Sequence, residues 1–227
     1  MEDERRTTST PPTSPPETDP RLIATIVRVA WFAILLGLAM EVLLLLLVAG
    51  MGVFPGLKAG VADLVRQISW SVIVCVGLAF GRAASTLRTP LMGILGLLAA
   101  PVAFTTARSL HEGAKNSLEI AGQGAASGGV WLVLVLALLK GTEYGCLGMA
   151  LSWVGQRTWG ERILAYVAVG LAAGVLFGSL TLALTYWGTP SHPSTVDVVS
   201  RGVNEMLFPV GCSVALYAAG VLEKRAH

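Results

Sequence analysis

The stretch LIATIVRVAWFAILLGLAMEVLLLLLVAG, residues 22–50, decides the class of this protein. Arg28 and Glu41 are its only charged residues. A helix needs about 20 apolar residues to cross the hydrocarbon core of a bilayer, and lipid offers no partner to free backbone groups. The stretch therefore predicts a transmembrane α-helix. Because it is too long for the apolar part of a signal peptide, we expect this span to be uncleaved.

Five more apolar segments follow, at about 67–83, 90–108, 130–155, 162–187 and 205–222. Of the 227 residues, 54% are hydrophobic and 13% are charged, which is the balance of a membrane protein. The second, third and sixth segments are short for a crossing, so we expect them to extend into their polar flanks. The sequence predicts an all-α fold, a polytopic membrane bundle of six transmembrane helices in the lipid bilayer.

The chain divides into a tail and a membrane domain. Residues 1–21 are rich in Pro, Thr and Ser and predict a disordered cytoplasmic tail. Residues 22–227 form the six-span domain, in hairpin units of about 22–88, 89–157 and 158–227. Cys75, Cys146 and Cys212 occupy similar places in the three units and are expected to act as small hydrophobes. An internal repeat and a coincidence of composition both stay open as explanations.

Basic residues gather in alternate loops and predict the orientation. One set of loops and chain ends carries Arg21, Arg82, Arg88, Arg157, Arg162, Lys224 and Arg225. The opposite set is nearly balanced in charge. The positive-inside rule then places both termini in the cytoplasm of a multi-pass protein of the plasma (inner) membrane.

Ionisable groups inside the apolar segments are the first candidates for function. Glu41 lies in the first segment, and Lys140 and Glu143 share one helix face of the fourth. Charges at this depth normally have a partner, so we expect Lys140 to pair with Glu41 or with Glu143. Two interpretations stay open. The groups line a proton or ion path, or they form a structural ion pair or a carboxyl kept protonated by burial.

Glycines at four-residue spacing occur in two of the segments. They are Gly141 and Gly145 in the fourth, and Gly170, Gly174 and Gly178 in the fifth. Such spacing allows close approach of helix backbones, either within the bundle or between copies of the chain.

The stretch SRGVNEMLFPVGCS, residues 200–213, opens the last apolar segment. If a helix starts here, Asn204 and Glu205 cap it and complement its dipole, and Pro209 falls in its tolerant first turns. The alternative is that Glu205 joins the ion path.

Two segments, AGVLFGSL at 173–180 and RGVNEMLF at 201–208, resemble the core hairpin of the MotA/TolQ/ExbB proton-channel family. The matching residues are Gly174 and Gly178 in one element, and Gly202, Val203, Glu205 and Leu207 in the other. Val175 and Val210 stand where that family carries threonines, its large cytoplasmic helical domain has no counterpart here, and six spans exceed its usual three or four. The resemblance implies a helical oligomer that conducts protons beside a partner's single span, with Glu205 as the family's glutamate.

Several classes of function lack support in the sequence. We find no phosphate loop, no catalytic dyad and no Cys/His metal pattern, so we expect neither an enzyme nor a cofactor or metal. His111, His192 and His227 are expected in loops or at the chain end. The net charge of +2, without basic and aromatic interleaving, argues against nucleic acid. Two classes remain: an ion (proton) channel or transport component, and a non-catalytic scaffold or assembly subunit, either of them a homo-oligomer or joined to other membrane subunits.

Overall fold

The computed structural model describes residues 20–54, 56–83, 88–118, 130–187 and 193–225. Within these residues it is all-helical and has no strand. The helices are α1 (Pro20–Gly50), α2 (Leu57–Ala83), α3 (Arg88–Ser117), α4 (Val130–Gly155), the short 3-10 helix η1 (Thr158–Glu161), α5 (Ile163–Trp187) and α6 (Thr195–Arg225). The predicted six-helix, all-α bundle is confirmed.

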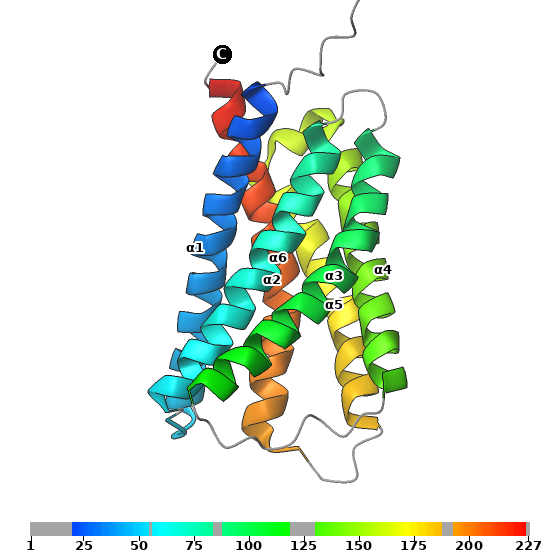
Figure 1. Ribbon diagram of the computed structural model, residues 1–227. Coiled ribbons are helices and arrows are strands. Elements are labelled where there is room, and N and C mark those ends of the chain that lie inside the picture. Colours follow the sequence, from blue (N-terminus) through cyan, green and yellow to red (C-terminus); the bar gives the residue numbers. More distant parts are fainter. Residues whose placement is uncertain (1–19, 55, 84–87, 119–129, 188–192, 226–227) are drawn as a thin grey trace, which may run out of the picture.

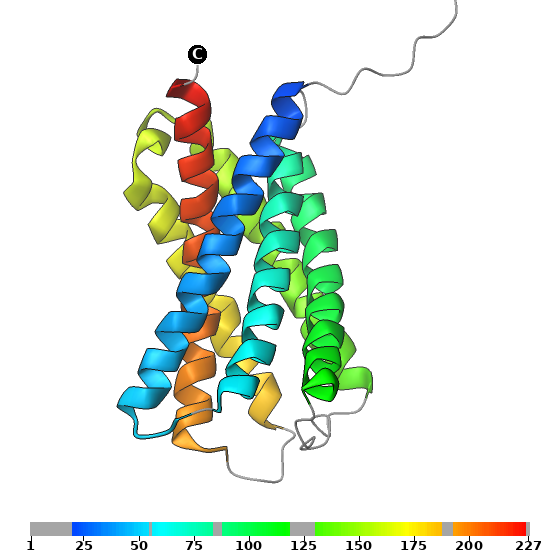
Figure 2. The same ribbon diagram turned by 60° about the vertical axis from the view of Figure 1, so that its left-hand side comes forward.

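The six long helices run alternately in opposite directions, side by side (Figures 1 and 2). The start of α1 and the end of α6 lie at the same end of the bundle, which we call the terminal end. The opposite end, where α1 finishes and α6 begins, is called the distal end. Residues 1–19 of the predicted disordered tail lie outside the described part of the chain, and α1 begins at Pro20.

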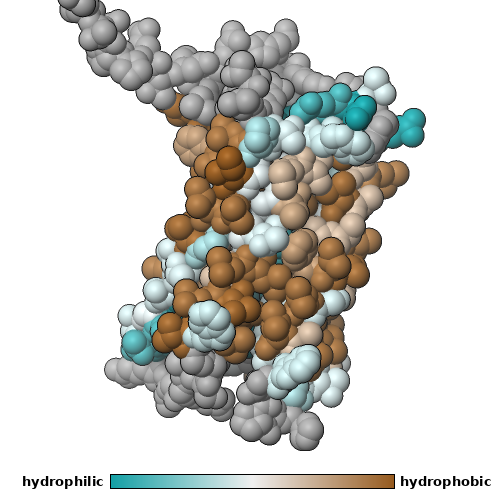
Figure 3. Space-filling model, turned by 90° about the vertical axis from the view of Figure 1, so that its right-hand side faces the viewer, coloured by the Kyte–Doolittle hydropathy of each residue, from teal (hydrophilic) through white to brown (hydrophobic). Residues whose placement is uncertain are grey.

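The outer surface is that of a membrane protein. All six long helices are long and apolar enough to cross a bilayer. Large hydrophobic side chains point outward, among them Trp31 and Leu46, and Figure 3 shows an apolar middle between more polar ends on one face. Trp131 at the start of α4 and Trp187 at the end of α5 are exposed at the distal end, where amphipathic rings suit a membrane interface.

The helices extend into their polar flanks, as expected for the second, third and sixth segments. α2 begins at Leu57, α3 continues to Ser117 and α6 begins at Thr195. The extensions place polar side chains near the distal end. Several of these side chains line the cavity that is described below.

The start of α6 overturns one prediction. The backbone N–H of Asp197 donates to Ser194 Oγ at 3.1 Å, and Ser194 Oγ donates to Asp197 Oδ2 at 2.7 Å. Ser194 therefore caps the helix. Glu205 lies well inside α6, so the interpretation of Asn204 and Glu205 as helix caps is wrong. Pro209 is likewise an interior proline and not a first-turn residue.

The spaced glycines hold helices of this same chain together. Gly170, Gly174 and Gly178 face α6, while Gly141 and Gly145 face α3. A Cβ atom at Gly170 would lie only 2.7 Å from Val210 Cα, so α5 and α6 approach closely only because the side chain is missing. The five glycines are used within the bundle.

Two of the three cysteines meet in the core. Cys75 Sγ on α2 lies 3.1 Å from Cys212 Sγ on α6; both are buried free thiols, whereas Cys146 is exposed on α4. The similar sequence positions of the cysteines thus correspond to different environments, and the three-hairpin repeat stays a prediction.

We expect Gly170→Ala to lower the free energy of unfolding by about 1–3 kcal/mol, because the added methyl group overpacks the α5–α6 contact. The measurement is the unfolding midpoint of the detergent-solubilised protein. Gly113→Ala is the control, since a Cβ atom at Gly113 meets no atom within 4 Å. Equal stability of the two variants would contradict the close packing of α5 on α6.

Candidate functional site

A buried ammonium bridges two carboxylates between α4 and α6. Lys140 Nζ donates to Glu143 Oε2 at 2.7 Å and also to Glu205 Oε2. Lys140 and Glu143 are buried, Glu143 completely, while the side chain of Glu205 is 19% exposed. The expected pairing of Lys140 with Glu143 is confirmed. We call these three residues the ion cluster.

The ion cluster lies deep in the membrane-spanning region. Lys140 comes ten residues after the start of α4 at Val130, and Glu205 comes ten residues after the start of α6 at Thr195. At about 1.5 Å per helical residue, both lie roughly 15 Å along their helices. That distance is about half of a typical hydrocarbon core of ~30 Å. Charges here are costly unless they are paired, and the cluster provides the pairing.

Backbone features of α5 and α6 bring Glu205 to Lys140. A Cβ atom at Gly178 would lie 3.1 Å from Glu205 Cβ, so a glycine here gives α6 room beside α5. Pro209 has no N–H to donate to the carbonyl of Glu205, four residues earlier, so the helical bond that would restrain this turn is missing. The two glycine-containing elements quoted above therefore meet in space at Glu205.

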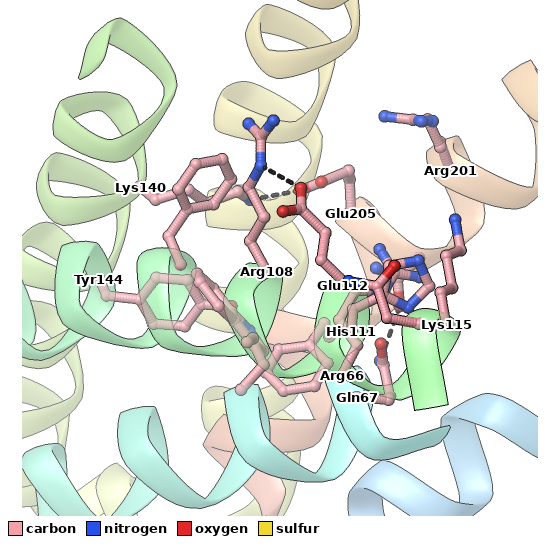
Figure 4. A pocket seen from close by; sticks show the side chains of 16 residues that line it. Arg66, Gln67, Arg108, His111, Glu112, Lys115, Lys140, Tyr144, Arg201 and Glu205 are labelled. Atoms are coloured by element: carbon pink, nitrogen blue, oxygen red, sulfur yellow. Dashed lines mark hydrogen bonds and ion pairs between the residues drawn. The ribbon is translucent and has the colours of Figure 1, made fainter. Parts of the chain in front are cut away.

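A cavity of about 540 Å³ leads from the distal end to the ion cluster (Figure 4). Its walls come from α2, α3, α4 and α6. The lining residues are Arg66, Gln67, Trp70, Phe104, Ala107, Arg108, His111, Glu112, Lys115, Asn116, Lys140, Tyr144, Arg201, Asn204, Glu205 and Phe208. Lys140 and Glu205 form part of its wall, so a solute in the cavity can reach the cluster.

Four aromatic rings form an apolar part of the cavity wall. Trp70 makes edge contacts with Phe104, Tyr144 and Phe208, with ring centroids 6.4, 5.7 and 6.2 Å apart. Because these rings come from four helices, the edge-to-face contacts hold the cavity walls at fixed separation.

Polar contacts brace the part of the cavity nearer the distal end. Gln67 Nε2 donates to Asn204 Oδ1 at 2.8 Å, joining α2 to α6. Arg66 pairs with Asp63 at 3.2 Å, and Arg108 pairs with Glu112 at 3.1 Å.

His111 belongs to this braced region and not to a loop. It lies on α3, where its Nδ1 atom is 3.0 Å from the carbonyl oxygen of Ala62 and 3.7 Å from Asp63 Oδ1. The loop prediction for His111 is wrong because α3 continues to Ser117. His192 and His227 lie outside the described residues.

Glu41 does not join the ion cluster. It is buried on α1 and is absent from the cavity wall, and the charges acting on it are those of Asp63 and Arg66 on α2. Within the described part of the chain its carboxyl makes no ion pair, so the alternative pairing of Lys140 with Glu41 is not found. Of the four candidates for an ion path, the structure brings together Lys140, Glu143 and Glu205.

A second cavity, of about 650 Å³, lies at the terminal end and is lined in part by Arg82, Gln156 and Tyr217. Between the two cavities the core is tightly packed. Cys75, Leu78, Leu147, Cys212 and Leu216 are each at most 1% exposed. We call these five residues the apolar plug. The ion cluster is thus reached from the distal end and closed from the terminal end.

Sequence reasoning missed most of the cavity wall. On α3 the wall residues are Phe104, Ala107, Arg108, His111, Glu112, Lys115 and Asn116, and on α6 they are Arg201, Asn204, Glu205 and Phe208. These single residues and adjacent pairs recur every three or four residues, which is the spacing of one helix face. The signal was present in the polar flanks, but those flanks were expected to contain loops around His111 and before Glu205.

No protein-family model, curated protein or solved structure matches this chain. Among the described residues there is no group of three or more His, Cys, Asp or Glu side chains placed to hold a metal ion.

We expect Lys140→Met to destabilise the protein by about 3–5 kcal/mol, because it leaves the buried Glu143 without its counter-charge. The double variant Lys140→Met/Glu143→Gln should recover a large part of this loss, since the charge is removed together with its partner. Unfolding of both variants in detergent gives the comparison. If Glu143→Gln lowered the stability of the Lys140→Met variant further instead of restoring it, Lys140 and Glu143 would not be coupled.

Proposed function

We propose that this chain is an ion-transport protein that moves protons through the ion cluster formed by Lys140, Glu143 and Glu205. The observation that carries the proposal is the cluster itself, at membrane depth and in the wall of a cavity that opens at the distal end. Intramembrane ionisable groups of this kind commonly mark ion pathways and proton relays.

The charge balance of the cluster favours a proton as the transported ion. Two carboxylates face one ammonium, so the fully ionised cluster carries one excess negative charge in an apolar setting. One added proton neutralises it. Glu143 Oε1 is buried and has no hydrogen-bond partner within the described residues, which leaves an oxygen available to receive that proton.

The path requires a change of shape on one side. Protons reach Glu205 through the water-sized space of the distal cavity, but the apolar plug separates the cluster from the cavity at the terminal end. Transport then requires the plug to open. The ion cluster is the site that protons reach alternately from each side of the membrane. The hairpin's resemblance to the MotA/TolQ/ExbB family supports the same role for Glu205.

Orientation follows from the charges at the two ends. Arg82, Arg157 and Arg162 lie at the terminal end, whereas acidic and basic groups balance more closely at the distal end. The positive-inside rule supports a plasma (inner) membrane protein with its terminal end in the cytoplasm. The distal cavity then opens away from the cytoplasm.

We expect purified protein in liposomes to conduct protons when a membrane potential drives them, and we expect Glu143→Gln and Glu205→Gln each to abolish most of the flux. The measurement is the quenching of a pH-sensitive dye after addition of valinomycin under a potassium gradient. Each substitution removes one proton-binding carboxyl while keeping its size.

Glu41→Gln is the matched control, because it removes another buried carboxyl of a spanning helix that lies outside the cavity wall. Flux should persist in this variant. Loss of flux in Glu41→Gln as well, or a folded wild-type protein without flux, would contradict the proposed path. The second outcome would favour a non-catalytic assembly subunit, whose partner would be sought among membrane proteins that co-purify with it.

A further inference from the structure

The distal cavity has properties that proton movement does not require. A proton relay needs only water and titratable groups, yet this cavity is large, has aromatic rings along one part and carries several cations along another. Its volume of about 540 Å³ falls within the range of roughly 300–1,000 Å³ that is typical of small-molecule sites.

The cavity wall carries an excess of positive charge. Its cations are Arg66, Arg108, Lys115, Lys140 and Arg201, and its carboxylates are Glu112 and Glu205. Asp63 and Glu143 pair with wall residues without lining the cavity themselves, and they bring the count to five cations against four carboxylates. The balance stays positive even when every carboxylate is counted as ionised.

Two of the arginines have donors to spare. Arg201 makes no ion pair within the described residues, and Figure 4 shows its guanidinium at the edge of the cavity. Arg66 also lies in the cavity wall, where its Nη2 atom pairs with Asp63 and its side chain is 43% exposed. Arginine guanidinium groups in a cavity suit a carboxylate or a phosphate, which accept two parallel N–H bonds.

The aromatic wall defines the rest of the ligand. Trp70, Phe104, Tyr144 and Phe208 offer ring surface in the deep part of the cavity wall, because each lies 13 or 14 residues from the distal end of its helix. A small inorganic anion would leave this surface uncovered. A ligand with an apolar body can cover the rings and place its anionic group on the arginines.

We propose that the distal cavity is a binding site for an amphiphilic organic anion, in which a phosphate or carboxylate is joined to an apolar body. Lys140, together with Arg201 and Arg66, binds the anionic group, and the aromatic rings hold the body. Glu205 competes with the ligand for Lys140, because both offer an anionic oxygen to the same ammonium. The inference deepens the proposed function by naming what shares the cavity with the proton.

The test is a binding titration in nanodiscs of neutral phosphatidylcholine, with 1-naphthyl phosphate as the probe and tryptophan fluorescence as the readout. Neutral 1-naphthol and inorganic phosphate test the two halves of the ligand separately. We expect 1-naphthyl phosphate to bind at least about tenfold more tightly than either. Equal binding of 1-naphthol would overturn the anionic part of the proposal, and equal binding of inorganic phosphate would overturn the amphiphilic part.

Two substitutions are expected to change the affinity for 1-naphthyl phosphate in opposite directions. Arg201→Gln should weaken binding by about tenfold, because it removes a charge-assisted contact. Glu205→Gln should strengthen binding several-fold, because it removes the competitor for Lys140. A cation site would show the reverse pattern in both variants, and that pattern would overturn the proposal.

Arg162→Gln serves as the control, since Arg162 is an exposed cation at the terminal end, outside both cavities. It should leave binding unchanged, and an effect equal to that of Arg201→Gln would identify non-specific charge attraction and overturn the site. Replacing part of the phosphatidylcholine with phosphatidylglycerol separates two sources of the anion. Competition by that lipid identifies a lipid head group, and its absence identifies a soluble ligand; either result supports the site.

Nanodiscs sustain no ion gradient, so the titration is independent of proton flux. Binding without flux would support the anion site and contradict the proton path. Flux without binding of 1-naphthyl phosphate would support the proton path and overturn the anion site.

Discussion

The free-energy cost of a charge in an apolar interior governs the arrangement of this bundle. Lys140 at the depth of the membrane centre needs a counter-charge, and Glu143 on its own helix supplies one. The second counter-charge, Glu205, comes from α6, which must therefore lie close to α4. The glycines of α5 and the proline of α6 provide the space and the backbone freedom for that approach. The small residues on α5 thus serve the ionic contact as well as helix packing.

The sequence predicted local features well and contacts between helices poorly. The six helices follow from apolar runs, and the Lys140–Glu143 pair follows from a spacing of three residues on one helix. Glu41 was an equally reasonable partner for Lys140 in the sequence, because nothing there says which helices are neighbours. Glu205 was misplaced for a different reason: extension into the polar flank was expected for this helix, but the cap interpretation placed its start at Asn204, whereas the true cap is Ser194. The same underestimate of helix length hid the cavity-facing stripe of α3.

The contrast between the two sides of the ion cluster gives the bundle a direction. A cavity lined by polar and aromatic residues of four helices reaches the cluster from the distal end, and the apolar plug closes the core toward the terminal end. Polar groups are tolerated at membrane depth where they line a cavity, and apolar close packing excludes water where no cavity exists. In this structure the bundle exposes the ion cluster to the distal cavity and closes it toward the terminal end, which is an arrangement that the proposed transport requires.

Competition for Lys140 connects the proton to the anion. The ammonium has three donors, and Glu143 and Glu205 accept two of them. A proton on Glu205 removes its negative charge and weakens its hold on Lys140, which then becomes available to an anion in the cavity. An anion bound there favours the protonated form of Glu205 in return, because linkage between two ligands is reciprocal. Under the two proposals, protonation of Glu205 and binding of the organic anion therefore favour each other. Lys140 couples the two events because it contacts both Glu205 and the anion.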